Sequence, residues 1–398
     1  MKNIFLASVV FVLSFSMGFA QDETPASNVM SPDLINVQNR CIVQLTDAVE
    51  GDRVRGVANA FAKRAKSSIK YVYANSIKGF TINMPCQAAD RAFGASALVS
   101  AMEPDSIVSI SKGKPNRGGG GTSPEQQKED WGVGRVGGPI DGPIINDDGS
   151  PIFTAWVIDT GVDLDHPDLN VDASRGFSVF RGKQDDQNGH GTHVAGTIAA
   201  IDNEIGSIGV APGATIVPVR VLDRGGSGTI SGVIAGVDFV AAEGNARPGD
   251  CVNMSLGGGV SRALDEAVKE AAADSGAYFA LAAGNSGADA KNHSPARVGG
   301  DSIDDNIFTI AAIAENTDQM PSWSNYGDAV EYAAPGVSIF SLWKDGGTET
   351  ISGTSMAAPH ACAVLMLTGA GSDGSLAINH TDNNDNGEYP IIHTDLSE

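Results

Sequence analysis

The stretch ISGTSMAAPHACAVLML, from Ile351 to Leu367, is a turn of small residues that leads into an apolar run. The turn, with a proline close behind it, is typical of the first turn of a helix, so Ser355 is predicted to lie where that helix begins. A serine there can cap the helix by accepting a backbone N–H. It can also be a nucleophile, with its own N–H and the positive end of the helix dipole facing an oxyanion. A lone serine at a helix start is usually a cap, so the choice depends on its companions upstream.

Apolar runs alternate with helical stretches in the part of the chain that leads to this serine. Continuous apolar strands separated by helices indicate a parallel sheet covered on both faces, with functional residues at the carboxyl ends of its strands. The predicted strands are 154–158, 215–221, 251–255, 278–282, 307–313 and 330–333, and the predicted helices are 193–201, 231–243, 263–276 and 358–368.

The N-terminal region predicts three segments before this sheet. Residues 1–20 are typical of a secretory signal, because Lys2 precedes an apolar run and small residues end at Ala20. That run is short for a membrane span, so we expect an exported, soluble product. Residues 21–111 predict a small α/β sandwich, and the Gly-rich polar segment 112–130 predicts an exposed linker before a second domain at 131–398. Within the sandwich, strands are expected at 41–49, 71–84 (a pair broken near 76) and 106–110, and helices at 54–66 and 88–99.

The formal net charge is −22, and residues 112–398 carry 16 Lys or Arg against 39 Asp or Glu. Such an acidic surface argues against nucleic-acid binding, whereas its carboxylates could be solvated or could hold calcium. The four cysteines lack metal-ligand spacing. Cys41 and Cys86 are expected to form a disulfide, and Cys251 and Cys362, which lie in apolar surroundings, are expected to be buried free thiols.

Three further polar residues lie in turns that follow predicted strands or begin predicted helices. Asp159 follows a strand, His190 lies between two glycines, and Asn285 lies in the turn AAGNSG. With these companions, Ser355 could attack a carbonyl carbon while His190 takes its proton and Asp159 orients the imidazole. The amide of Asn285 could donate to the oxyanion.

Alternatives remain for each residue taken alone. Asp159 and Asn285 could be ordinary turn formers, and His190 could be a cap. His193 lies one helical turn after His190 and could be mistaken for the base, or could join it in a metal-dependent hydrolase, although two histidines without a third ligand are weak evidence for a metal. The segment from Asp382 resembles half of an EF-hand loop, but His393 stands at its twelfth position, so we interpret it as a turn cluster.

The blocks DTGVD, HGTHVAG, AAGN and GTSMAAPH resemble the four signature blocks of the subtilisin-like serine proteases, in the same order, and longer runs are similar to the proteinase K branch. The resemblance implies an α/β fold: a three-layer subtilisin-like domain with a central, mainly parallel sheet, preceded by a small α/β sandwich propeptide. It implies a secreted, monomeric serine endopeptidase of broad specificity that acts on proteins and peptides. The propeptide would be a folding aid and an intramolecular inhibitor, cut between Ser111 and Pro124. A catalytically silent subtilase-like binding protein is the alternative.

The resemblance also implies binding residues. Two edge segments would hold the substrate as an added β-strand, and Ala283, Gly284 and residues 288–292 would wall a roomy apolar pocket. A structural calcium would be held by Glu331 with the carbonyls of Asp305 and Ile307, although the local sequence departs from the family pattern there; Asp163 and Asp165 are weaker candidates. The edge residues are Gly225, Gly226, Ser227, Gly228, Ser255, Leu256 and Gly257.

Overall fold

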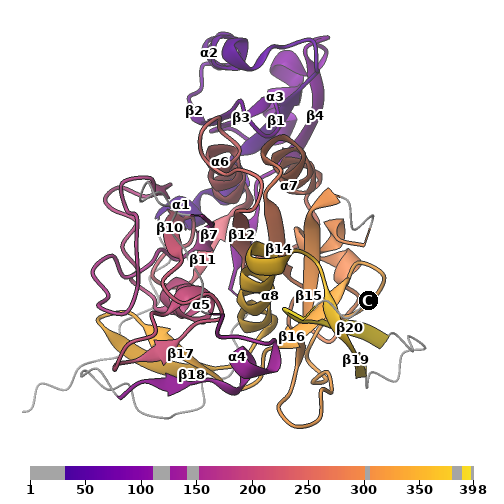
Figure 1. Ribbon diagram of the computed structural model, residues 1–398. Coiled ribbons are helices and arrows are strands. Elements are labelled where there is room, and N and C mark those ends of the chain that lie inside the picture. Colours follow the sequence, from indigo (N-terminus) through magenta and orange to yellow (C-terminus); the bar gives the residue numbers. More distant parts are fainter. Residues whose placement is uncertain (1–31, 111–125, 141–151, 301–304, 379–387, 396–398) are drawn as a thin grey trace, which may run out of the picture. The chain divides into compact units, whose positions relative to one another are not determined.

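The computed structural model describes residues 32–110, 126–140, 152–300, 305–378 and 388–395 (Figure 1). The predicted signal peptide, most of the predicted linker and most of the turn cluster after residue 381 lie outside these residues. Within them, no helix is long and apolar enough to cross a membrane.

A nine-stranded sheet forms the centre of the larger part of the fold, in the order β19-β20-β16-β15-β14-β12-β7-β10-β8. The seven strands from β16 to β8 are parallel, and β19 pairs antiparallel with β20 at one edge. The predicted α/β class with a mainly parallel sheet is therefore confirmed. The strands are β7 (Thr154–Asp159), β8 (Phe177–Ser178), β10 (Thr215–Arg220), β12 (Cys251–Met254), β14 (Tyr278–Ala282), β15 (Ile307–Ile313), β16 (Tyr332–Pro335), β19 (Ser372–Ile378) and β20 (Glu388–Ile392).

Helices cover both faces of this sheet, and β7 shows why. Its residues Ala155 and Val157 pack into a core cluster with two helices on one face, and Trp156 and Ile158 pack into a second cluster with two helices on the other. Alternate residues of a strand point to opposite faces, so a strand that is apolar throughout fits between two helical layers. On the first face are α5 (His190–Ala199) and α8 (Thr354–Thr368), and on the second are α6 (Ile230–Val240) and α7 (Arg262–Ser275).

Residues 41–104 form a separate antiparallel sheet in the order β2-β3-β1-β4, packed against α2 around Phe61, Phe80 and Phe93. The strand predicted at 106–110 is present at 107–109, but it does not join this sheet, whose fourth strand is formed by residues 99–104. The predicted second helix is a short α-turn followed by a π-turn. The elements are β1 (Cys41–Leu45), α2 (Gly51–Ala65), β2 (Ile69–Tyr73), β3 (Gly79–Ile82), α3 (Cys86–Ala89), η2 (Asp90–Gly94), β4 (Val99–Pro104) and β5 (Ile107–Ser109).

Hydrogen bonds join this smaller sheet to α6. The Tyr73 hydroxyl donates to the Ser231 carbonyl at 2.9 Å, and the Asp105 carboxylate accepts from the Ser231 N–H at 3.0 Å and its hydroxyl at 2.6 Å. Asp238 of α6 accepts from the backbone N–H of Asn75 and of Ser76, each at 2.8 Å. Asp105 therefore places a negative charge at the positive end of α6.

The structure contains two disulfides, one of which corrects the sequence prediction. Cys41 and Cys86 are bonded, as predicted. Cys251 and Cys362 are also bonded, with Cα atoms 5.7 Å apart, so they are not free thiols. The reason is spatial: Cys251 begins β12 and Cys362 lies on α8, which packs on that face of the sheet.

Candidate active site

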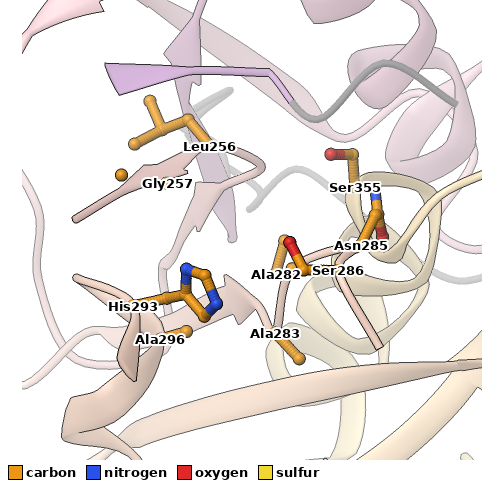
Figure 2. Close-up of a pocket in the computed structure, with 11 residues that line it drawn as sticks. Leu256, Gly257, Ala282, Ala283, Asn285, Ser286, His293, Ala296 and Ser355 are labelled. Carbon is orange, nitrogen blue, oxygen red and sulfur yellow. The ribbon is translucent and has the colours of Figure 1, made fainter. Parts of the chain in front are cut away.

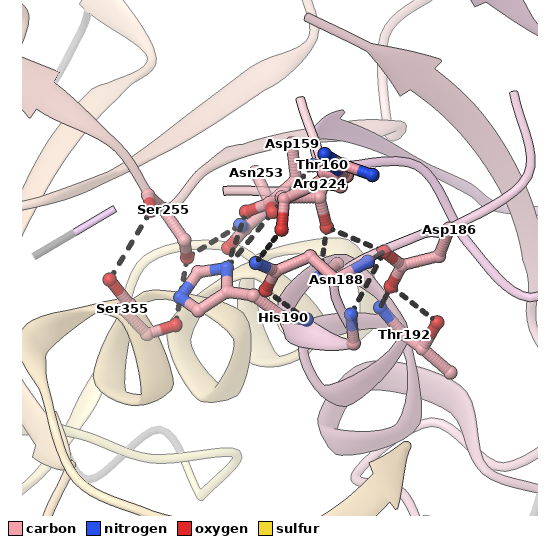
Figure 3. A network of polar contacts seen from close by, with 12 residues as sticks. Asp159, Thr160, Asp186, Asn188, His190, Thr192, Arg224, Asn253, Ser255 and Ser355 are labelled. Carbon is pink, nitrogen blue, oxygen red and sulfur yellow. Dashed lines mark hydrogen bonds and ion pairs between the residues drawn. The ribbon is translucent and has the colours of Figure 1, made fainter. Parts of the chain in front are cut away.

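Asp159 and His190 meet where the carboxyl end of β7 faces the start of α5. The His190 Nδ1 lies 2.9 Å from both carboxylate oxygens of Asp159, and Asp159 is fully buried (Figure 3). A carboxylate only accepts hydrogen bonds, so the proton belongs on Nδ1 and the lone pair on Nε2. The buried Nε2 has no hydrogen-bond partner among the residues that the structure describes. The ring is therefore oriented and able to accept a proton.

Asp186, which the sequence interpretation missed, holds the loop that carries His190. Its carboxylate accepts from the Thr160 hydroxyl at 2.9 Å, the Thr192 hydroxyl at 2.7 Å and the Gly189 N–H at 2.9 Å. Gly189 has φ 115°, and a Cβ there would lie 2.1 Å from the Trp343 ring, so only glycine fits this position. In the sequence, the only sign of this role was an aspartate four residues before the histidine.

Ser355 is the second residue of α8, and its hydroxyl donates to the Ser255 carbonyl at 3.2 Å. Figure 3 shows the Nε2 edge of His190 turned toward Ser355.

A second bond runs the other way, from the Ser255 hydroxyl to the Ser355 carbonyl at 2.8 Å. In a regular α-helix the N–H of residue 359 would donate to the Ser355 carbonyl, but Pro359 has no N–H. The hydroxyl of Ser255, held by the Asn253 amide at 2.8 Å, takes its place. This bond satisfies the carbonyl that Pro359 leaves without a donor. α8 begins at Thr354, so Ser355 lies at the helix start as predicted, although the stretch 358–368 was too short.

A double-mutant cycle tests this pairing. Ser255→Ala leaves a buried carbonyl without a donor and should lower the free energy of unfolding by about 1–3 kcal/mol. Pro359→Ala restores an N–H to the same carbonyl, so Ser255→Ala should cost clearly less in that background. Both are measured by denaturant unfolding in a Ser355→Ala background, which prevents self-digestion. Equal losses in the two backgrounds would refute the pairing.

Asn285 lies beyond the carboxyl end of β14 and faces the start of α8. Its Oδ1 accepts from the Thr354 N–H and from the Thr354 hydroxyl, each at 2.9 Å, which fixes the orientation of the amide. Asn285 and Ser355 line the same pocket (Figure 2). The amide is thus placed to donate beside the serine.

Asn285→Ala is expected to lower kcat about 100- to 1000-fold with little change in KM, because an oxyanion donor acts in the transition state. The measurement is steady-state hydrolysis of a chromogenic peptide. Asn285→Asp is the matched variant, since it retains the acceptor for Thr354 and loses the donor. A wild-type kcat in both variants would contradict the role of the amide.

The pocket beside Ser355 has a volume of about 70 Å³ and is lined mostly by small residues. The structure places four of the predicted binding residues in its wall, namely Leu256, Gly257, Ala283 and Gly284. None of residues 288–292 lines it; His293 and Ala296, which the sequence interpretation did not select, do. The full lining is Leu256, Gly257, Gly258, Ala282, Ala283, Gly284, Asn285, Ser286, His293, Ala296 and Ser355.

The two predicted edge segments flank a peptide strand of the chain itself. β5 lies antiparallel between β11 (Ser227–Thr229) and β13 (Gly257–Gly258), with Ser109 opposite both Ser227 and Gly257. The Ile110 N–H donates to the Gly226 carbonyl at 2.9 Å, and the Ile110 side chain lies against Gly226. Gly225 lies in the preceding turn, where its N–H donates to Asp223. The geometry is that of a strand added between two edges.

His193 does not join the site. It is fully buried, its Nε2 lies 3.1 Å from the Ile339 carbonyl, and burial lowers its pKa to about 3. The ring is therefore neutral, and its Nε2 is directed at the β17 strand (Ile339–Trp343).

The predicted calcium ligands are arranged around backbone donors. The Glu331 carboxylate accepts from the N–H of Gly300 and, at 2.7 Å, from that of Thr309, and Asp305 accepts from the Ile307 N–H at 3.0 Å. No cluster of three or more metal-binding side chains occurs in the described part of the chain. Calcium held by Glu331 and the carbonyls of Asp305 and Ile307 stays a prediction.

The fold and the site define a class of protein, in which a histidine bonded to an aspartate is turned toward a serine at the carboxyl edge of a parallel sheet. The chain belongs to the subtilase family, whose model matches residues 155–376.

Individual relatives are similar over most of this chain. It is 40% identical over 372 residues to the alkaline serine exoprotease A of Vibrio alginolyticus, covering 87% of this chain and 64% of that protein. It is 36% identical to the subtilisin-like serine protease AsES of Sarocladium strictum, covering 77% of this chain and 74% of that protein. A crystal structure of a cold adapted subtilisin-like serine proteinase matches with 40% identity and a TM-score of 0.53, over 67% of this chain and 98% of that one.

Proposed function

We propose that the protein is a secreted serine endopeptidase that cuts itself from a precursor. The observation that carries the proposal is the oriented His190 ring, bonded to Asp159 and with an unpartnered Nε2 turned toward Ser355. Segment 21–111 would be its propeptide and intramolecular inhibitor. The position of β5 between the two edge segments supports this role, because a bound propeptide tail excludes other peptides. Export rests on the predicted signal at residues 1–20.

In the reaction, Ser355 attacks the carbonyl carbon and His190 takes its proton, then passes it to the leaving amine. Asp159 holds the ring and stabilises its charged form. The Ser355 N–H and the Asn285 amide donate to the oxyanion. In the structure the Ser355 hydroxyl bonds the Ser255 carbonyl. A substrate N–H that takes this carbonyl releases the hydroxyl to bond Nε2, so substrate binding would complete the triad.

The register of β5 indicates the bond that is cut first. Ile110 donates to Gly226 and Ile230 donates to the Ser106 carbonyl, so even-numbered residues bond toward β11. Alternate residues of an antiparallel strand turn opposite ways, so odd-numbered residues bond toward β13, where Ser109 faces Gly257. A strand that continues this register presents position 111 to Ser255, beside Ser355. We therefore infer a first cut between Ser111 and Lys112.

Mass spectrometry of the propeptide fragment tests this cut. The expected fragment ends at Ser111, and a first fragment that ends elsewhere would contradict the register. Val108 is 1% exposed and Ile107 is 40% exposed. Burying a charge without a partner is unfavourable, so Val108→Asp should slow processing strongly and Ile107→Asp, the matched control, only slightly. No processing of the wild-type chain in a protease-free host would contradict the proposed function itself.

A further inference from the structure

We propose that His293 gives the pocket beside Ser355 a preference for glutamate over glutamine before the scissile bond, among the other side chains that it accepts, and that this preference increases as the pH falls. The inference rests on the proposed function and specifies its substrate. The side chain of the residue before the cut is called the primary side chain below.

The pocket is placed to receive the primary side chain. It adjoins Ser355, and it is bordered by β13, which pairs with the strand β5. Most of its wall is alanine, glycine and backbone, which cannot change charge. Selectivity for charge must therefore come from a larger side chain in the wall.

His293 is the only residue with a titratable side chain in that wall. It is half-buried, and its ring makes no hydrogen bond to any residue that the structure describes. Figure 2 shows the ring between the strand that carries Gly257 and the segment Ala282–Ala283, with Ala296 beneath it. Its backbone is anchored, because its N–H donates to the Ala290 carbonyl at 3.0 Å and its carbonyl accepts from the Arg297 N–H at 2.9 Å. The imidazole is thus held at the pocket with both nitrogens available.

The charged groups on the neighbouring elements are already paired. Lys291 of η3 (Ala290–Asn292) pairs with Asp289 at 2.5 Å. Arg297 of η4 (Ala296–Val298) pairs with Asp265 of α7 at 3.5 Å. None of these four lines the pocket, and β13 and β14 contribute no titratable side chain to its wall. The charge that a primary side chain meets there is that of His293.

The chemistry of imidazole then gives the preference. Histidine is the side chain whose charge ordinarily changes between about pH 5 and pH 8. An imidazolium donates a charge-assisted hydrogen bond to a carboxylate. A neutral ring distinguishes less between the side chains of glutamate and glutamine, which have nearly the same shape. Glutamate is ionised over most of this range. The advantage of glutamate over glutamine should therefore increase as the pH falls.

The test uses three chromogenic peptides that carry the tail sequence Ile-Val-Ser-Ile followed by Glu, Gln or Leu before the leaving group. The ratio of kcat/KM for the Glu peptide to that for the Gln peptide is measured from about pH 8 to about pH 5.5. Any pH effect on the catalytic steps common to both peptides cancels in the ratio. We expect the ratio to rise about fivefold, the size of a partly solvated ion pair.

His293→Phe and His293→Gln should both flatten this dependence, and Ser286→Ala, in the same wall, should retain it. A ratio that is independent of pH in the wild type, or a slope that survives both His293 variants, would overturn the inference. If either His293 variant fails to fold, the other decides the outcome. Cleavage of the Leu peptide by the wild type separates this inference from the proposed function, because absence of that cleavage would overturn both.

Discussion

Ser355→Ala is expected to leave the precursor uncut and to lower peptide hydrolysis about a millionfold, the loss seen when the nucleophile of subtilisin, a protein of the same family, is removed. The variant lacks the hydroxyl that attacks the carbonyl, whereas the Ser355 carbonyl retains its bond from Ser255. The fold should therefore survive. Gel analysis of the purified protein from a protease-free host gives the result directly.

A trace of wild-type mature enzyme provides the control for this variant. Added in trans, it should cut the Ser355→Ala precursor in the segment after residue 110, which shows that the cleavage site is intact. Normal maturation of the variant without added enzyme would mean that another protease does the processing.

Asp159→Asn is expected to lower kcat about ten-thousandfold while the protein folds and matures slowly. The carboxylate accepts from His190 Nδ1 and holds the proton there. An amide that turns its NH₂ toward the ring favours the proton on Nε2, where the ring can no longer accept the hydroxyl proton of Ser355. Hydrolysis of the Leu peptide gives kcat.

Asp163→Asn is the matched control for Asp159→Asn. Asp163 lies in the same turn, but its carboxylate accepts from the Gly346 N–H at 3.0 Å and does not contact His190. It should retain near-wild-type kcat. Equal losses in the two variants would mean that disturbance of the turn, and not the tautomer of His190, lowers the rate.

The sequence predicted the central sheet and the positions of Asp159, His190, Asn285 and Ser355 because these signals are local. Each buried strand is a short apolar run, and each polar residue lies in a turn next to such a run or at a helix start. Parallel strands bring these turns to one edge of the sheet. The resemblance of the four blocks to the subtilisin-like proteases indicated which of these residues has which role.

The features that the sequence did not predict depend on tertiary contacts. The Cys251–Cys362 disulfide forms because α8 packs on β12, and no local sequence pattern predicts that packing. The segment 106–110 has strand composition, but it pairs with β11 and β13 in a separate three-stranded sheet, and both partners lie far along the chain. His293 is a single histidine in a polar loop, which without the pocket has no distinguishing mark.

The most direct test of the account is labelling of the mature enzyme with a fluorophosphonate, which reacts with a serine only when a base activates it. We predict that one residue per molecule is modified, that peptide mass spectrometry identifies it as Ser355, and that His190→Ala slows the labelling by orders of magnitude. Absence of labelling, modification of a different serine, or an unchanged rate in His190→Ala would contradict the claim that Ser355, His190 and Asp159 act together.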